Sequence, residues 1–255
     1  MTFNQSKHKF YMPKTKFIIC VMAALLPALA FSQQENKATR IIEQQHHDLT
    51  EKDFADDSPN DRYKRLTESD YQKVANELGI EVAAIKALSK IEAGNAGFVN
   101  PGKPTINFDL WVFKSMLRKN GHTISAASKK APIAFARVNA KRFGGYGKAQ
   151  WARLNDACRV NRDLALQSTF WGMFQIGGFN YKKCDCSSAE EMATLMKQSE
   201  AMQLELFARF IRNCGLVKYI KAHNWYAFSK GYNGNRVVKG YAARIAREYA
   251  RFKKQ

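Results

Sequence analysis

A glutamate on the apolar side of a predicted short helix sets narrow limits on how this chain folds. In EVAAIKALSKIEAG, Val82, Ile85 and Glu92 share one face, because residues three and four positions apart are neighbours on a helix. Small residues follow, so the carboxyl group stands where the helix gives way to a glycine-containing turn. We therefore expect a helical domain that leaves this carboxyl group uncovered at the mouth of a cleft.

Other segments carry regular helical patterns. LTESDYQKVANELG begins with Thr67 as a cap, has Asp70 three residues later and stops at Gly79. Helical signals return after Asn161, continue through WGMFQI and become strong in SSAEEMATLMKQSEAMQLELFARFIRN. A last helix is expected over roughly Tyr241 to Phe252. We predict an α+β domain that is predominantly α-helical.

One stretch has a strand pattern instead. After two prolines and a glycine, the segment TINFDLWVF alternates Ile106, Phe108 and Leu110 with polar positions. We expect a short strand or β-hairpin here, with Asp109 pointing away from the apolar set.

The N-terminal region has the features of a signal peptide. Four lysines precede the apolar run FIICVMAALLPALA, which is shorter than a membrane-spanning helix, and Ala30 and Ser32 permit cleavage. An uncleaved membrane anchor is the alternative. From Gln33 to Arg65, polar residues and the turn signal DDSPND predict a flexible linker. We expect a signal peptide over residues 1–32, a linker over 33–65, a folded domain over 66–255, and a periplasmic or secreted protein without stable membrane insertion.

The charge of the chain favours a polyanionic partner. The formal net charge is +19, and the excess of Lys and Arg is concentrated after Trp111. Such a surface attracts nucleic acid, acidic lipid or an anionic cell wall. The predicted export favours the wall, and the basic stretches lack the regular aromatic interleaving of single-strand binders as well as zinc-finger or helix-turn-helix patterns. We expect no nucleic-acid partner.

The expected mature chain holds four cysteines, Cys158, Cys184, Cys186 and Cys214. An even number in an oxidising compartment favours two disulfides. A bond between Cys184 and Cys186 would close a strained small ring, so each is expected to pair with one of the other two, and the pairing stays open. Four thiolates can also bind zinc, but paired CxxC motifs are missing, and we predict neither a metal nor a cofactor.

Glu92 suits the chemistry of a general acid. Glycoside hydrolysis needs a carboxylic acid that is still protonated when the bond breaks. Burial on the apolar face and a place near the C-terminal end of the helix both disfavour the charged carboxylate. The alternative is a glutamate at a helix edge with its carboxylate in water.

Four segments in a fixed order resemble a known family. They are ELGIEVAAIKALSKIEAGNAGF, YGKAQWARLN, STFWGMFQIGGFNY and GYNG. Their order and approximate spacing resemble the N-acetylmuramidase domain of phage endolysins and bacterial wall hydrolases, over nearly everything from Leu66 to the C-terminus. WGMFQI and GYNG are also similar to the GLMQI and AYN motifs of lytic transglycosylases and goose-type lysozymes. The resemblance implies a lysozyme-like fold, with a small β-hairpin region beside the catalytic helix and Glu92 as the catalytic acid.

The resemblance also implies roles for residues outside that helix. Gln175 would reach the cleft, while its neighbours Met173, Phe174 and Ile176 would pack in the core. Tyr232 and Asn233 would line the saccharide site, the ring against a sugar and the amide on an N-acetyl group. Tyr146 is a further substrate-binding candidate, and Gly172 would let the backbone approach the glutamate helix closely.

The chain departs from the family at NFDLWVF, where similar muramidases carry a Phe-Glu-Arg-His run. Asp109 stands at the glutamate position, while Leu110 and Trp111 replace the basic pair. Asp109 is therefore a second catalytic candidate that would orient water or steady positive charge, and a structural hydrogen-bonding role is the alternative. The stereochemical course stays open with it, since the separation of the two carboxylates decides between inversion and retention.

The leading hypothesis is an exported muramidase that hydrolyses the β-1,4 bond between N-acetylmuramic acid and N-acetylglucosamine in peptidoglycan glycan strands. A lytic transglycosylase would keep the fold and the substrate but form 1,6-anhydro products. A wall-binding protein that retained the fold would not cut at all.

Overall fold

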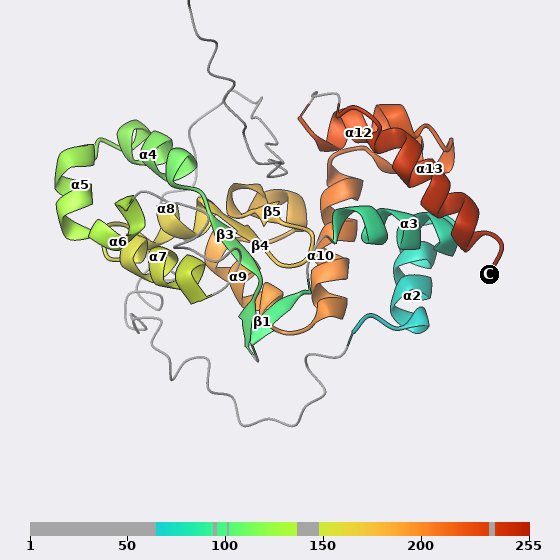
Figure 1. Cartoon of the computed structure of the whole chain (residues 1–255), viewed down its shortest axis with the longest axis horizontal. Coiled ribbons are helices and arrows are strands. Elements are labelled where there is room, and N and C mark those ends of the chain that lie inside the picture. The colour runs from blue at the N-terminus through green and yellow to red at the C-terminus, as the bar shows by residue number, and fades with distance from the viewer. Residues whose placement is uncertain (1–64, 94–95, 101, 137–147, 235–237) are drawn as a thin grey trace, which may run out of the picture.

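A computed structural model describes residues 65–93, 96–100, 102–136, 148–234 and 238–255 of the chain. Helices predominate, and two small antiparallel sheets lie among them (Figure 1). The helices are α2 (Glu68–Leu78), α3 (Val82–Glu92), α4 (Leu110–Lys119), α5 (Ile124–Lys130), α6 (Pro132–Phe135), α7 (Lys148–Cys158), α8 (Arg162–Gln167), the 3₁₀ helix η2 (Gly178–Cys184), α9 (Ala189–Met196), α10 (Glu200–Asn213), α11 (Val217–Lys221), α12 (Trp225–Tyr232) and α13 (Tyr241–Phe252). The predicted fold class is confirmed. The predicted signal peptide and nearly all of the linker, up to residue 64, lie outside the described residues.

The sheets pair segments that are far apart in the sequence. Strands β1 (Phe98–Asn100) and β2 (Lys103–Pro104) form a hairpin, and β3 (Ile106–Phe108) pairs with β4 (Thr169–Trp171), which in turn pairs with β5 (Ile176–Gly177). The expected strand in TINFDLWVF is therefore present, although it ends at Phe108 and a helix begins at Leu110.

The segment WGMFQI forms the β4–β5 hairpin, so the helix predicted through it is wrong. Its turn needs positive φ angles, 69° at Gly172 and 50° at Gln175, which a right-handed helix does not allow.

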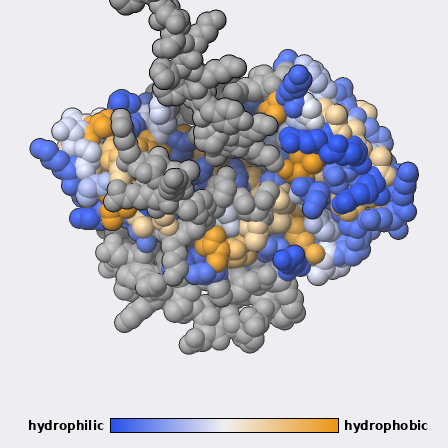
Figure 2. All heavy atoms as spheres, viewed as in Figure 1, coloured by the Kyte–Doolittle hydropathy of each residue, from blue (hydrophilic) through white to orange (hydrophobic). Residues whose placement is uncertain are grey.

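Helix α10 stands between two groups of elements (Figure 1). On one side, α13 packs along α3, and α2 and α12 complete the group; on the other side lie α4 to α8. A continuous core joins the two groups, and the stacked rings of Phe174 and Phe207, with centroids 4.3 Å apart, connect the β4–β5 turn to α10. Figure 2 shows hydrophilic residues over most of the outer surface around α13.

The predicted helix limits are confirmed where caps mark them. Thr67 and Asp70 form the capping box of α2, Gly79 ends it with φ 61°, and α13 spans the predicted range. The long methionine- and phenylalanine-rich stretch divides into α9 and α10, because Ser188 and Ser199 each accept a backbone hydrogen bond at a new N-terminus.

The four cysteines of the folded domain are not joined by disulfides in the structure, which differs from the two bonds expected. Cys184 and Cys186 instead fill places in the core as small apolar side chains. Burial raises the pKa of both thiols, to about 11 for Cys186. Among the described residues, no three His, Cys, Asp or Glu side chains are grouped so as to hold a metal ion, and no helix is long and apolar enough to cross a membrane.

Candidate active site

Glu92 is the last residue of α3, and its side chain is only 7 % exposed. The apolar residues Ile85 and Leu88 on the same face are fully buried and hold the helix in the core. The expected inward position of Glu92 is thus confirmed. Glu92 stands at the C-terminal end of the helix, where the helix dipole disfavours a negative charge.

The chain that follows Glu92 is held by Thr105, which lies between β2 and β3. The Thr105 hydroxyl donates to the carbonyl oxygen of Ala96 (2.5 Å), and its amide donates to the carbonyl oxygen of Gly97 (2.9 Å). The Thr105 carbonyl oxygen accepts from the amide of Gly172 (2.8 Å). This one residue therefore joins the turn after the glutamate helix to the turn of the β4–β5 hairpin.

Two buried polar side chains of α10, Glu200 and Gln203, hold the same turns from the other side; we call them the α10 pair. Glu200 accepts from the amides of Gly97 (2.9 Å) and Leu66 (3.3 Å). Gln203, which is fully buried, accepts from the amide of Met173 (2.8 Å) and donates to the carbonyl oxygen of Gly97 (3.1 Å). The α10 pair thus fixes the backbone on both sides of the site.

Two glycines make this close approach possible. A Cβ atom on Gly97 would lie 2.7 Å from Cγ of Glu200, and one on Gly172 would lie 2.8 Å from Oε1 of Gln203. Both distances are too short for carbon in contact. Gly172 therefore approaches α10, whereas the sequence had suggested that it approaches the glutamate helix.

Gln175 is half-buried and takes part in the turn itself. Its amide nitrogen donates to the carbonyl oxygens of Gly172 (2.8 Å) and Thr105 (3.4 Å). Met173, Phe174 and Ile176 are buried as predicted.

Tyr232 lies in the core and not on a saccharide surface. Its side chain is 1 % exposed, its ring stands among Phe207, Phe210 and Phe228, and its hydroxyl donates to the carbonyl oxygen of Phe174 (3.5 Å). A ring enclosed in this way has no face left for a sugar, which corrects the stacking role predicted for it.

Asn233, the C-cap residue of α12, is buried as well. Its side-chain amide donates to the Ser229 carbonyl oxygen one turn earlier (2.8 Å). The Tyr232 and Asn233 side chains of the GYNG segment therefore stabilise the fold. The Tyr232 hydroxyl also connects this segment to the β4–β5 turn. The other predicted substrate residue, Tyr146, lies outside the described residues.

Asp109 is the N-cap of α4. One of its carboxylate oxygens accepts from the amides of Trp111 (2.8 Å) and Val112 (3.0 Å). Its backbone stands at the far end of β3 from Thr105, roughly 13 Å away at the usual rise of a strand.

Helix α7 supports the corner that carries Asp109. Gln150 accepts from the Phe108 amide (3.2 Å), and the buried Arg153 donates to the carbonyl oxygens of Phe108 (3.4 Å) and Ala134 (3.1 Å). Burial lowers the pKa of Arg153, and the negative charge of Asp109 counteracts this. The QWARLN part of the sequence thus acts as a scaffold for the β3–α4 corner.

Hydrogen bonds that the sequence did not show join the chain after Glu92 to the turn of the β4–β5 hairpin. Thr105 and the α10 pair are the connecting residues, and neither was predicted. One sequence signal could have identified the α10 pair. Glu200 and Gln203 are polar, lie three positions apart on a predicted helix and have the apolar residues Ala201, Met202 and Leu204 beside them.

The structure is a mainly helical α+β domain with a buried glutamate at the end of a helix. Comparisons with known proteins identify its family. The family model for N-acetylmuramidase matches residues 81–253. The crystal structure of the Burkholderia AP3 phage endolysin is similar to this chain, with 30% sequence identity and a TM-score of 0.64 over 79% of this chain and 76% of that one. None of the curated protein sequences matches. The chain belongs to the N-acetylmuramidase family and is a peptidoglycan hydrolase of lysozyme-like fold.

Proposed function

We propose that the protein hydrolyses the β-1,4 bond between N-acetylmuramic acid and N-acetylglucosamine, with Glu92 as the general acid. The observation that carries the proposal is the position of Glu92, 7 % exposed at the C-terminal end of α3. Burial and the helix dipole both favour the protonated carboxyl group, which is the form that a general acid needs.

In the proposed reaction the Glu92 carboxyl group gives its proton to the glycosidic oxygen as the bond to the anomeric carbon breaks. The N-acetylglucosamine side leaves as an alcohol, and water adds its oxygen to the anomeric carbon. The proton that this water loses passes to solvent, from which the Glu92 carboxylate regains a proton. The α10 pair keeps the turn after Glu92 in place, so that the carboxyl group is presented in one orientation.

Asp109 receives a structural role in this proposal. Its carboxylate already accepts two amide hydrogen bonds at the start of α4, and this is the role of a helix cap.

We further propose that the protein is exported to the periplasm or medium, where the charge left after loss of the four signal lysines, 19 − 4 = +15, attracts it to the anionic wall. The N-terminal apolar run supports export. Cell fractionation would test it: protein confined to the cytoplasm would contradict this part alone.

The test of the reaction is mass spectrometry of the soluble products released from purified sacculi by the parent protein and by the Glu92→Gln variant. Reducing-end muropeptides from the parent alone are expected. Anhydro products would instead identify a lytic transglycosylase. If neither protein released products while both bound sacculi, the chain would be a wall-binding protein and the proposed mechanism would be wrong.

A further inference from the structure

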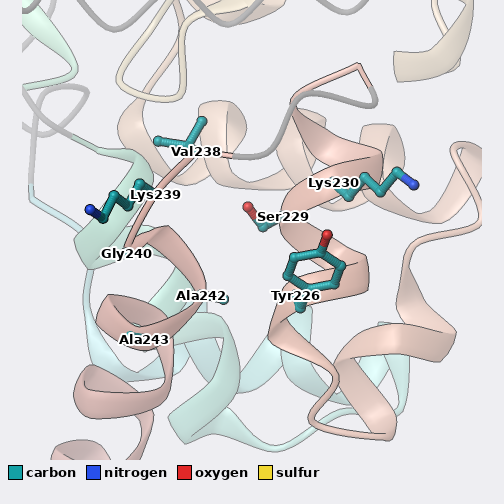
Figure 3. Close-up of a pocket in the computed structure, with 8 residues that line it drawn as sticks. All are labelled: Tyr226, Ser229, Lys230, Val238, Lys239, Gly240, Ala242 and Ala243. Atoms are coloured by element: carbon teal, nitrogen blue, oxygen red, sulfur yellow. The ribbon is translucent and has the colours of Figure 1, made fainter.

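A small pocket lies where α12 meets the start of α13 (Figure 3). Its volume is about 260 Å³. It is lined by Tyr226, Ser229, Lys230, Val238, Lys239, Gly240, Ala242 and Ala243. None of these residues was a predicted site residue.

The pocket adjoins the GYNG segment on both sides. Ser229 lines it and accepts, through its carbonyl oxygen, the side-chain hydrogen bond of Asn233. Val238 and Lys239 follow the same segment, and α13, which forms one wall, packs along α3, the helix that ends at Glu92. The pocket therefore belongs to the same group of elements as the proposed catalytic acid.

The lining combines positive charge with small apolar surfaces. Lys230 and Lys239 stand at opposite rims and extend outward, so their amino groups flank the pocket and do not lie inside it (Figure 3). Neither forms an ion pair with any carboxylate in the described part of the chain. Tyr226 and Val238 are 56 % and 41 % exposed, and the remaining wall consists of glycine and alanine. Such a lining suits a ligand that carries carboxylates and methyl groups.

We propose that this pocket binds the stem peptide that peptidoglycan carries next to the bond to be cut; the proposal rests on the proposed function. Stem peptides combine alanine methyl groups with free carboxylates, which match the small walls and the two lysines. A pocket smaller than the ~300–1,000 Å³ of a typical small-molecule site has room for a few small groups and not for a disaccharide. A sugar would also need several fixed polar partners, whereas the fixed polar side chain here is Ser229.

The test compares solubilised glycan strands that keep their stem peptides with strands from which an amidase has removed them. Binding is measured with the Glu92→Gln variant, so that cleavage does not interfere. With the pocket unchanged, the Glu92→Gln protein should bind peptide-bearing strands more tightly than stripped strands. Adding Lys230→Glu and Lys239→Glu should weaken the binding of peptide-bearing strands about tenfold, as expected for the loss of two exposed ion pairs and the gain of repulsion. Binding of stripped strands should change little.

Two further variants make the result specific. Lys129→Glu/Lys130→Glu changes the net charge by the same amount on exposed positions of α5, in the other group of elements, and should leave the peptide preference intact (Figure 1). Ala243→Trp fills the pocket without changing its charge and should remove the preference, with circular dichroism as the check of folding.

Equal binding of both strand types by the parent pocket, or an equal effect of the α5 control, would overturn the stem-peptide assignment. Failure of the proposed function would look different, because it would appear as absent cleavage by the parent protein whichever strand it prefers to bind.

Discussion

The C-terminal end of α3 and the N-terminal end of α4 each carry a carboxyl group, and the two ends treat it in opposite ways. At the end of α3, Glu92 is almost fully buried and stands at the negative end of the helix dipole. At the start of α4, Asp109 is half-buried and accepts two backbone amide hydrogen bonds at the positive end. The first position disfavours a charged carboxylate, and the second gives its carboxylate the hydrogen bonds of a helix cap.

This difference separates two residues that look alike in the sequence, where both are acids in motif-bearing segments. A general acid must hold a proton, and a helix cap must be able to accept hydrogen bonds. The surroundings of Glu92 therefore suit chemistry, while those of Asp109 suit structure.

The largest effect is expected from Glu92→Gln. The amide has the shape of the acid but cannot give up a proton, so the rate of sacculus cleavage should fall about a thousandfold, within the usual contribution of a general acid. The thermal midpoint should change little. Cleavage at more than a tenth of the parent rate would show that the two helix ends do not differ in the proposed way.

The next effect is expected from Gln203→Leu, which removes half of the α10 pair. The buried amide of Met173 loses its acceptor, and the free energy of unfolding should fall by about 2 kcal/mol. The exposed Gln198→Leu is the matched control and should be near neutral. Urea denaturation measures both.

The activity of folded Gln203→Leu tests whether the α10 pair also positions Glu92 for catalysis. Because the turn after Glu92 is less firmly held, kcat should fall more than KM rises. An unchanged kcat in the folded variant would mean that the α10 pair serves stability alone.

Two substitutions at Asp109 separate its charge from its hydrogen bonds. Asp109→Ala removes the cap of α4 and should cost about 1 kcal/mol of stability, whereas Asp109→Asn keeps a capping oxygen and should cost a few tenths of a kcal/mol at about pH 7. Both should retain cleavage. If Asp109→Asn were stable but as inactive as Glu92→Gln, Asp109 would be catalytic and the contrast between the two helix ends would be lost.

The sequence predicted those parts of the fold that local rules decide. Thr67, Gly79 and the apolar spacing of α13 mark helix limits through caps and periodicity, and the inward position of Glu92 follows from the same periodicity. The split between α9 and α10 was visible only as two serines, each of which is also a common helix-surface residue.

The errors concern features that depend on distant parts of the chain. WGMFQI has a helical apolar pattern, yet pairing of β4 with β3, some sixty residues earlier in the sequence, makes it a hairpin. The ring of Tyr232 is enclosed by side chains of α10 and α12, which no motif at GYNG reveals. The α10 pair was missed for the same reason, because its partners lie about thirty and one hundred residues away.

The smallest effect concerns Glu81, at the other end of α3 from Glu92. It lies at the positive end of the dipole, and one of its carboxylate oxygens accepts from Lys253 (2.6 Å) and from the Tyr249 hydroxyl (2.9 Å). The other carboxylate oxygen lies 3.3 Å from Nε2 of His223. The hydrogen bond from Lys253, followed by that from Tyr249, lowers the pKa of Glu81. Its contribution to stability is therefore present above pH 4.5 and is lost as the pH falls through the lowered value.

Glu81→Gln should accordingly destabilise the protein slightly at pH 7, by less than Asp109→Ala, because the carboxylate is well exposed and water screens its partners. The difference from the parent should shrink as the pH is lowered from 5 to 3, measured by thermal unfolding at each pH. A difference that grew on acidification would mean that the carboxylate is destabilised at this end of α3 as it is at the Glu92 end. In that case burial, and not the direction of the helix, would be what distinguishes Glu92 from the other acids.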